Sequence, residues 1–340
     1  SNCNGMKKAY FLAVSTALFL AAPASAQLLP SYGGERAGAS ALSFLKNDLH
    51  VGSVGMAGAH AAQVGNPYSW NGNPAGASDV NERSLALSNG FVGGGVQHSL
   101  LALTLPTKDK TTSIGLIGNV LQTGAFEERT EFQPEGTGRL LYGTHASLGV
   151  GLARRLSEQF SMGLVLKGIH EVVGDYRNTT AGVDLGFLYR TDVRGLQFAV
   201  ALRNFGGSSA LQGDFLASLF NRTPVTALNK NTFPTEFCMG VNGIAWERGK
   251  QNLRVGIQLN HPNDNAENYR IGLEYTANDR LVVRTGVALQ VAGRTWPALG
   301  LSAKARLGRQ PIWLDYAATP TAFTGMASVV GLRLPLTLQN

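Results

Sequence analysis

Few side chains in this sequence suggest catalysis. The 340 residues include six histidines, which are His50, His60, His98, His145, His170 and His261. Their spacing matches no metal-binding pattern, so we expect neither a metal site nor a bound cofactor. His145 and Ser147 could act as base and nucleophile, but they share the inward face of a predicted strand, whereas a membrane phospholipase would need them on the outward face. We therefore expect no enzymatic activity.

Cysteine usage and the distribution of charge exclude further classes of site and of function. Cys3 lies ahead of the predicted mature protein, so Cys238 has no partner for a disulfide and a cysteine metal cluster is excluded. The formal net charge is +7, but the basic residues lie singly along predicted strands and form no face interleaved with aromatic rings. We therefore expect no binding of nucleic acid.

The elements that must position these residues are segments in which every second residue is apolar. From Thr180 the sequence reads TAGVDLGFLYR, where apolar residues from Ala181 to Tyr189 share one face and only Leu188 breaks the alternation. A period of two over about ten residues is typical of a transmembrane β-barrel, whereas the strands of soluble sandwiches are commonly about five or six residues long. The 42 glycines and 15% of charged residues fit a barrel with an apolar outside and a polar inside.

We predict an all-β fold, a transmembrane antiparallel β-barrel of about 14 strands with an N-terminal plug inside the barrel. The strands are expected near residues 84–91, 95–106, 111–120, 140–156, 160–173, 180–190, 196–205, 235–246, 251–260, 268–276, 281–290, 297–307, 310–319 and 324–336. Every second connection is brief and polar, and the two longest connections, 121–139 and 206–234, fall among the others. This segregation is typical of outer-membrane barrels, which have short periplasmic turns and longer outer loops.

The residues before the barrel divide into two parts. Residues 6–26 begin with Met6 and two lysines and continue through an apolar stretch to a small-residue site, which is the order of a cleavable signal peptide. We expect residues 1–26 to be removed, residues 27–83 to form the plug and residues 84–340 to form the barrel. The plug segment is too long for a linker and too apolar around 39–45 to be disordered. These features predict export to the cell outer membrane, where a lipid bilayer surrounds the barrel.

Charged residues alternate with the apolar ones and are expected to face the lumen. The predicted lumen charges are Lys167, Arg203, Arg254, Arg270, Glu274, Arg284 and Asp315. The reverse register would place charges in lipid at a cost of roughly 2 to 4 kcal/mol each at the midplane. The positive excess could attract anions, but pairing with the plug and neighbouring strands is the favoured interpretation because unpaired buried charges are costly.

The plug carries a specific motif. The run from Phe44 reads FLKNDLHVGSVGMAGAHAAQVGNPYSWNGNPAGAS and resembles the N-terminal signature of the PorV/PorQ family, relatives of the FadL-type outer-membrane barrels. The matching positions are Phe44, Leu45, Lys46, Val51, Gly52, Gly55, Met56, Gly58 and Ala59, then Trp70, Asn73, Pro74, Ala75 and Gly76. Further matches are Asn204 and Phe205, Phe233 to Thr235, His261 to Asp264, and Asp315 and Tyr316. Two additional residues separate Trp70 from the Asn73 motif.

The motif residues also have a physical interpretation of their own. Asn73 before Pro74 favours an extended or turn conformation, and Gly76 afterwards permits positive φ, so we predict a tight turn. Gly52, Gly55 and Gly58 allow the plug backbone to approach the barrel wall closely. A structural role is favoured over direct ligand contact.

The long connection contains LQGDFLASLF, which predicts a short amphipathic helix on the outer side. Its apolar residues are Leu211, Phe215, Leu216, Leu219 and Phe220. This helix could fold over the barrel mouth, or its apolar face could bind a partner protein, and the sequence favours neither.

The resemblance implies a part in type IX protein secretion. In that interpretation the loops bind the C-terminal sorting domains of secreted proteins, and the barrel passes this cargo from the outer-membrane translocon to the surface-attachment proteins. The alternative is a FadL-like transporter of hydrophobic small molecules with the plug as gate. The many lumen arginines weigh against the alternative, because such a transporter should enclose a largely apolar pocket. A barrel that only scaffolds its neighbours is a third possibility.

Overall fold

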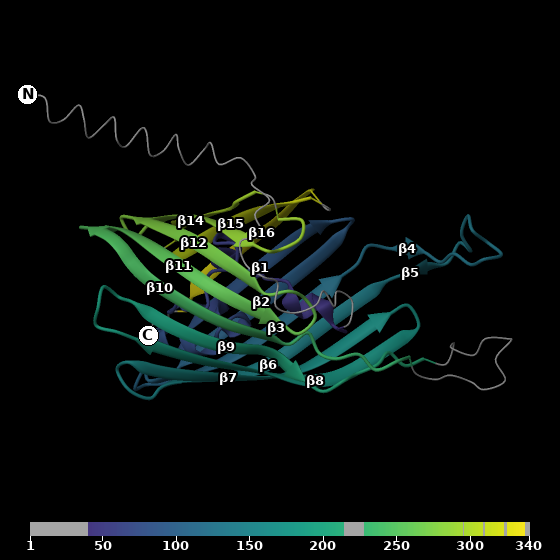
Figure 1. Cartoon of the computed structure of the whole chain (residues 1–340), viewed down its shortest axis with the longest axis horizontal. Coiled ribbons are helices and arrows are strands. Elements are labelled where there is room, and N and C mark those ends of the chain that lie inside the picture. The colour runs from purple at the N-terminus through teal and green to yellow at the C-terminus, as the bar shows by residue number, and fades with distance from the viewer. Residues whose placement is uncertain (1–39, 214–227, 295, 309, 323–324, 337–340) are drawn as a thin grey trace, which may run out of the picture. The chain divides into compact units, whose positions relative to one another are not determined.

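Fourteen antiparallel strands close into a barrel in the computed structural model, which describes residues 40–213, 228–294, 296–308, 310–322 and 325–336 (Figure 1). The barrel strands are β1 (Ser84–Gly93), β2 (Val96–Pro106), β3 (Thr112–Gln122), β6 (Gly143–Arg155), β7 (Phe160–Val173), β8 (Tyr176–Arg190), β9 (Gln197–Gly206), β10 (Glu236–Arg248), β11 (Gln251–Pro262), β12 (Asn268–Ala277), β13 (Leu281–Leu289), β14 (Ala298–Leu307), β15 (Gln310–Thr321) and β16 (Gly325–Pro335). The predicted fold class is confirmed. The predicted signal peptide lies outside the described residues.

The order of the strands is that of a simple meander. Each barrel strand pairs with its neighbours in sequence, and β1 pairs with β16 from Ser84↔Pro335 to Phe91↔Ser328 to close the barrel. Every second connection, including the two-residue turn Gly249–Lys250 between β10 and β11, is short and lies at one end, whereas the other end carries the two longest connections together with some short turns. At the β12–β13 turn, Asn278 and Asp279 have φ of 52° and 53°, and two consecutive positive φ angles are typical of tight hairpin turns.

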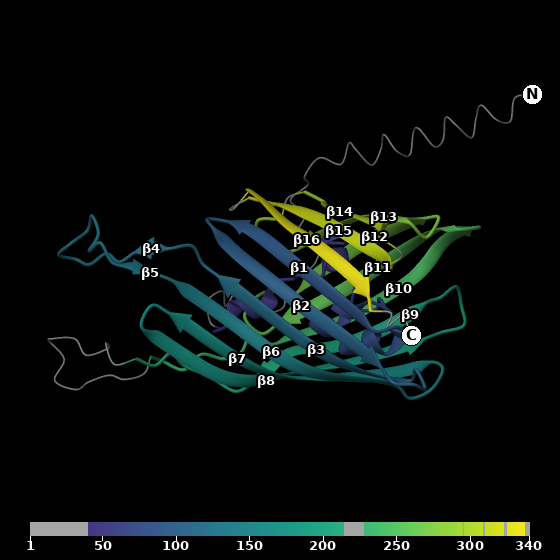
Figure 2. The same ribbon diagram turned by 180° about the vertical axis from the view of Figure 1, so that it is seen from behind.

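One predicted strand is wrong in its extent. The segment 140–156 was expected to be continuous, but it divides at Tyr142 into β5 (Leu140–Leu141) and β6. The two adjacent leucines break the alternation of β6, and they pair instead with β4 (Phe126–Glu127) in a separate two-stranded ribbon. Figures 1 and 2 show this ribbon running out past the ends of β3 and β6.

The two faces of the barrel wall differ sharply. Along β6, the outward Leu148 and Leu152 are 61% and 51% exposed, whereas the inward Ala153 is 1% exposed. A continuous band of exposed Leu, Val and Ile on the outward face is compatible with lipid as the surrounding solvent. No helix among the described residues is long and apolar enough to cross a membrane.

The segment 40–83, called the plug below, lies inside the barrel and supplies much of the core. It contains four short helices, η1 (Ser43–Lys46), α2 (Val51–Gly55), η2 (Pro67–Asn71) and η3 (Pro74–Asp79). Plug residues such as Tyr68 and Trp70 form one apolar cluster with inward residues such as Ala102 and Val165. The core of this protein is therefore the interface between plug and wall.

Candidate functional site: the plug, its contacts and the cavity beside it

Glycines on the inward face of the wall leave strand backbone bare, and the plug backbone packs against it. Each such glycine position is called a ledge below. Gly256, Gly272 and Gly286 occupy one inward row across β11, β12 and β13. A Cβ at Gly272 would lie 2.7 Å from Met56 Cβ, and a Cβ at Gly286 would overlap the Met56 carbonyl group. The motif residue Met56 therefore rests on bare strand backbone, which only glycine provides.

The motif glycines of α2 fit the same part of the wall. A Cβ at Gly55 would lie 2.8 Å from Gly300 Cα on β14. Gly58 has φ +94°, and a Cβ there would overlap the Arg270 guanidinium. Gly55 therefore serves close approach, whereas Gly58 serves both close approach and a backbone conformation that L-residues rarely adopt.

The Asn73–Gly76 motif begins a helix. Asn73 caps η3, because its Oδ1 accepts a hydrogen bond from the Ala75 N–H at 3.1 Å and Pro74 occupies the first helical position. The Asn73 Nδ2 also donates to the Phe187 carbonyl at 3.2 Å. Gly76 does not use the positive φ that glycine permits. Gly76 is needed because a Cβ there would lie 2.7 Å from the Gln63 carbonyl oxygen.

A second pair of ledges holds the rest of the motif. Gly163 lies opposite Gly186 on β7 and β8, and a Cβ at Gly163 would lie 2.5 Å from the Ala75 nitrogen. Gly151 on β6 faces the Trp70 ring, with 2.5 Å between a Cβ and the ring carbons, and the Trp70 Nε1 donates to Thr104 Oγ1 at 2.9 Å. Sequence reasoning missed these wall glycines, although their inward position in the alternation could have indicated them.

The predicted lumen charges lie on the inward face, and most are paired. Lys167 Nζ donates to Asp184 at 2.7 Å, and Arg284 Nε donates to Glu274 at 2.6 Å. The other short pairs are Arg203 with Glu236 at 3.1 Å and Arg333 with Asp315 at 2.7 Å. Arg270 lies 3.8 Å from Glu236, and Arg254 makes no ion pair with a described residue. This pairing leaves a smaller positive excess than the sequence alone suggests.

The plug is fastened near both of its ends. Lys46 Nζ lies 2.6 Å from Asp264 on the β11–β12 loop, and Ser40 Oγ donates to the same carboxylate. At the short-turn end, Asp79 lies 2.8 Å from Arg155 and 2.6 Å from Arg190. Since both arginines belong to the wall, Asp79 is the charged link that holds η3 in place.

We expect Asp79→Asn to loosen the short-turn end of the plug. The substitution leaves two partly buried guanidinium groups facing each other without an anion, at a cost of about 2 to 3 kcal/mol, because the three side chains are only partly shielded from water. Limited proteolysis of the purified protein should then cut the plug several times faster. Asp109→Asn, in an exposed turn, is the control and should leave the cleavage rate unchanged. Equal rates for wild type and Asp79→Asn would contradict the anchoring role.

An Asp–Ser–His cluster with a buried serine and histidine lies within the plug. Ser53 Oγ donates to the Asp48 carboxylate and lies 2.6 Å from His60 Nδ1, and the His50 and His60 rings are 4.8 Å apart. Ser53 is 0% exposed, so no substrate can reach its hydroxyl group. The cluster therefore stabilises the plug. Sequence reasoning missed it because the histidines approach each other only after α2 and the following turn have formed.

The plug should loosen at acidic pH. Burial, followed by the nearby His60 and two arginines, lowers the pKa of His50 well below its usual value, and burial also lowers the pKa of His60. The two histidines bind protons more readily when the plug is released than when it is packed. Their contribution to the stability of the packed plug is therefore complete above about pH 6.5 and is lost as the pH falls. Thermal unfolding should therefore show a lower midpoint at pH 5 than at pH 7.5. The variant His50→Gln should reduce this difference, and an unchanged difference would contradict the assignment.

A cavity of about 240 Å³ lies between the plug and the wall at the long-loop end. Plug residues 46–49 form one side, and the ends of β1, β2, β12, β13, β15 and β16 form the other. Its lining combines apolar side chains such as Leu49, Phe91 and Val329 with the charged Arg270 and Arg294. The expectation that a transporter needs an apolar pocket is thus met only in part.

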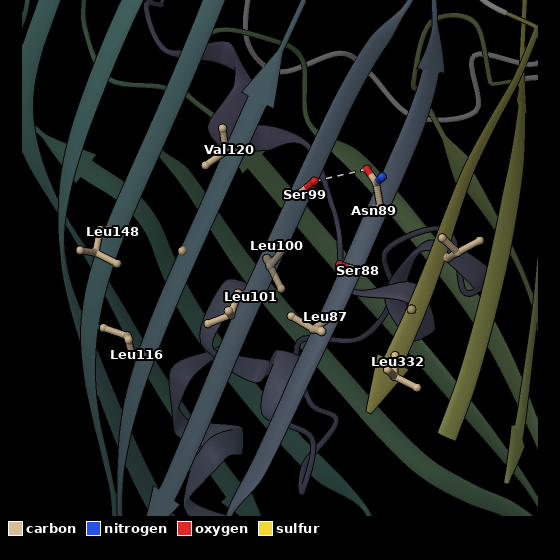
Figure 3. A pocket seen from close by; sticks show the side chains of 13 residues that line it. Leu87, Ser88, Asn89, Ser99, Leu100, Leu101, Leu116, Val120, Leu148 and Leu332 are labelled. Carbon is tan, nitrogen blue, oxygen red and sulfur yellow. Dashed lines mark hydrogen bonds between the residues drawn. The ribbon is translucent and has the colours of Figure 1, made fainter. Parts of the chain in front are cut away.

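A second, larger hollow lies on the outward face. Figure 3 shows it across β1, β2, β3 and β6, with Leu87, Leu101 and Leu148 among its lining residues. Ser99 and Asn89, paired at 3.5 Å, are the polar residues at its edge. Because Gly118 leaves the outward face bare, acyl chains of a surrounding bilayer can fill this groove.

The predicted partner helix falls almost entirely outside the described residues. Phe215, Leu216, Leu219 and Phe220 all lie there. Leu211 is described, and its carbonyl oxygen accepts a hydrogen bond from the Leu228 N–H at 3.1 Å. The helix and its apolar face remain a prediction.

Comparisons with known proteins identify the fold. Neither a family model nor a curated protein sequence matches the chain. Among solved structures, the Pseudomonas putida toluene transporter TodX is 12% identical, with a TM-score of 0.52 over 90% of this chain and 98% of that chain. The monoaromatic hydrocarbon channel CymD is 12% identical, with a TM-score of 0.57 over 85% and 98%. A Pseudomonas aeruginosa FadL homologue is 11% identical, with a TM-score of 0.50 over 84% and 98%. The chain has the barrel fold of these FadL-like proteins.

Proposed function

We propose that this barrel resides in the outer membrane and admits small hydrophobic molecules through the space beside its plug. The observation that carries the proposal is the cavity at the long-loop end, which has one apolar side and lies between a fixed plug and the barrel. The solved structures with this fold include proteins described as a toluene transporter and a monoaromatic hydrocarbon channel. The outward apolar band supports a membrane location, because that surface would be costly in water.

Uptake in cells tests this proposal. A host that lacks its own hydrocarbon channels should take up labelled toluene several times faster when it carries this protein in its outer membrane. Val329→Trp fills the cavity and should return uptake to the background rate. The neighbouring Val330 is 42% exposed on the outward face, so Val330→Trp is the matched control and should retain uptake. Equal uptake with and without the wild-type protein would overturn the proposal.

A second candidate function is the cargo shuttle of type IX secretion that the PorV/PorQ resemblance implies. Apolar residues exposed on the β4–β5 ribbon and its loop favour it, above all Phe132, which is 91% exposed. Exposed aromatic side chains are unfavourable in water unless a partner covers them. In this candidate function the ribbon and the 207–235 connection would receive secreted proteins bearing a C-terminal sorting domain, and the translocon and attachment-complex proteins would be further partners.

Purification from the native envelope tests the second candidate. In that case, gentle detergent extraction of the tagged protein should recover secreted proteins that share one C-terminal domain. Phe132→Ser should reduce this recovery several-fold, whereas Phe198→Ser, on the outward barrel wall, should leave it unchanged. Recovery of lipid alone would count against the shuttle.

A further inference from the structure

The cavity beside the plug has an apolar side that suits a small, compact ligand. Leu49 and Val54 of the plug line it together with Val92 and Val329 of the wall. Its volume of about 240 Å³ is below the roughly 300 to 1,000 Å³ of sites that hold drug-sized ligands. The apolar part of a ligand in this space is therefore about the size of one ring.

Two arginines at the same cavity lack a carboxylate within close ion-pair distance. The Asp48 carboxylate, its acidic lining residue, is already hydrogen-bonded to Ser53 and to the His50 N–H. Arg270 lies 3.8 Å from the nearest carboxylate, that of Glu236. Arg294 makes no ion pair with any described residue. A ligand with a negative charge would supply the missing partner.

Two buried polar atoms in the wall point to the same conclusion. His98 and Thr319 line the cavity and are 1% and 3% exposed, and neither His98 Nε2 nor Thr319 Oγ1 has a hydrogen-bond partner among the described residues. The Asn47 amide group lies 3.4 Å from His98 Nδ1, which assigns the proton to Nε2. Buried donors without acceptors are unfavourable, so these two atoms favour a ligand that can accept a hydrogen bond.

We propose that this cavity binds a small amphipathic anion, with one apolar ring against the Leu49–Val329 side and a carboxylate toward Arg294 and Arg270. The inference rests on the proposed uptake function and narrows its substrate class from neutral hydrocarbons to aromatic carboxylates. Arginine suits this role because its planar fork matches the two oxygens of a carboxylate. His98 and Thr319 then supply donors that a neutral hydrocarbon would leave unpaired.

Calorimetric titration of the detergent-purified full chain with benzoate and with toluene tests the inference. We expect benzoate to bind at least tenfold more tightly than toluene, and Arg294→Gln to weaken benzoate binding about tenfold while leaving toluene binding within twofold. Arg254→Gln is the matched control, because Arg254, like Arg294, makes no ion pair with a described residue but does not line the cavity. It should not change either affinity.

Three outcomes would overturn the inference: equal affinity for benzoate and toluene, no effect of Arg294→Gln, or an equal effect of Arg254→Gln. Arg294 lies in an exposed loop after β13, so the variant should fold, and retention of heat-modifiable migration on gels verifies this. The test is separable from that of the proposed function. If the protein takes up toluene but does not bind benzoate, the anion inference alone is overturned. If it takes up no toluene but binds benzoate, and Val329→Trp abolishes that binding, hydrocarbon uptake alone is overturned.

Discussion

Gly286→Ala should displace the plug from the barrel wall. The added methyl group would occupy the position of the Met56 carbonyl, and neither the strand backbone of β13 nor the plug backbone can move without breaking other contacts. Overpacking of this kind costs about 3 kcal/mol. We expect a lower unfolding temperature and rapid proteolysis of the plug, while the barrel itself stays heat-modifiable on gels.

A matched glycine on the opposite face provides the control. Gly118 also lies within a barrel strand, but it faces outward, and a Cβ there would meet Leu148 Cδ1 at 3.7 Å and the Ser147 carbonyl oxygen at 3.9 Å, which are ordinary contacts. Gly118→Ala should change stability by no more than about 0.5 kcal/mol. If both substitutions have the same effect, the cost arises from strand glycines in general and the ledge interpretation fails.

Glu236→Gln should be nearly as damaging as the ledge substitution. Its carboxylate accepts from Arg203 at 3.1 Å and from Asn260 at 2.6 Å, and Arg270 lies beyond at 3.8 Å. The amide keeps the shape but removes the charge, so the buried Arg203 guanidinium loses its counterion and the half-buried Arg270 loses its nearest carboxylate. Breaking a buried pair in this way costs about 3 to 5 kcal/mol. Chemical denaturation monitored by tryptophan fluorescence measures the loss.

Two further variants isolate the cause. Removal of both partners, in Arg203→Met with Glu236→Leu, should be less damaging than Glu236→Gln alone, because no unpaired charge remains at this position. Asp175→Asn breaks the exposed pair with Arg139 and should have little measurable effect, since water screens that pair. A double variant as unstable as the sum of its single variants would indicate lost packing rather than lost charge compensation.

The strand pattern could be predicted because alternation and turns are local. Inward and outward faces follow from a period of two, and this was sufficient to place fourteen strands within a few residues. The exception at Tyr142 has a local cause that was visible, since Leu140 and Leu141 are adjacent. The β4–β5 ribbon was not predicted because its two strands have only two residues each, too few to show any period.

The candidate site could be predicted less fully from the sequence than the strands could. Which inward charge pairs with which depends on register between strands, so the pairing of Arg284 with Glu274 could not be predicted even though both were placed inward. The plug motif could be found as a motif, but its contacts with Gly163 and Gly286 join segments far apart in the chain. The cavity depends on where the plug ends and the wall begins, and no local pattern encodes that space.

The β1–β16 seam also has a consequence for assembly. It is the one barrel pairing that joins distant parts of the described sequence, and contacts of this kind form slowly because the chain must first close a large loop. Tyr68 of the plug reaches both edges, since its hydroxyl donates to the Leu87 carbonyl of β1 at 2.6 Å and lies against Gly331 of β16. If the plug packs on β1 first, Tyr68 would already be in place to contact β16. Packing of the plug would therefore precede the pairing of β16 with β1.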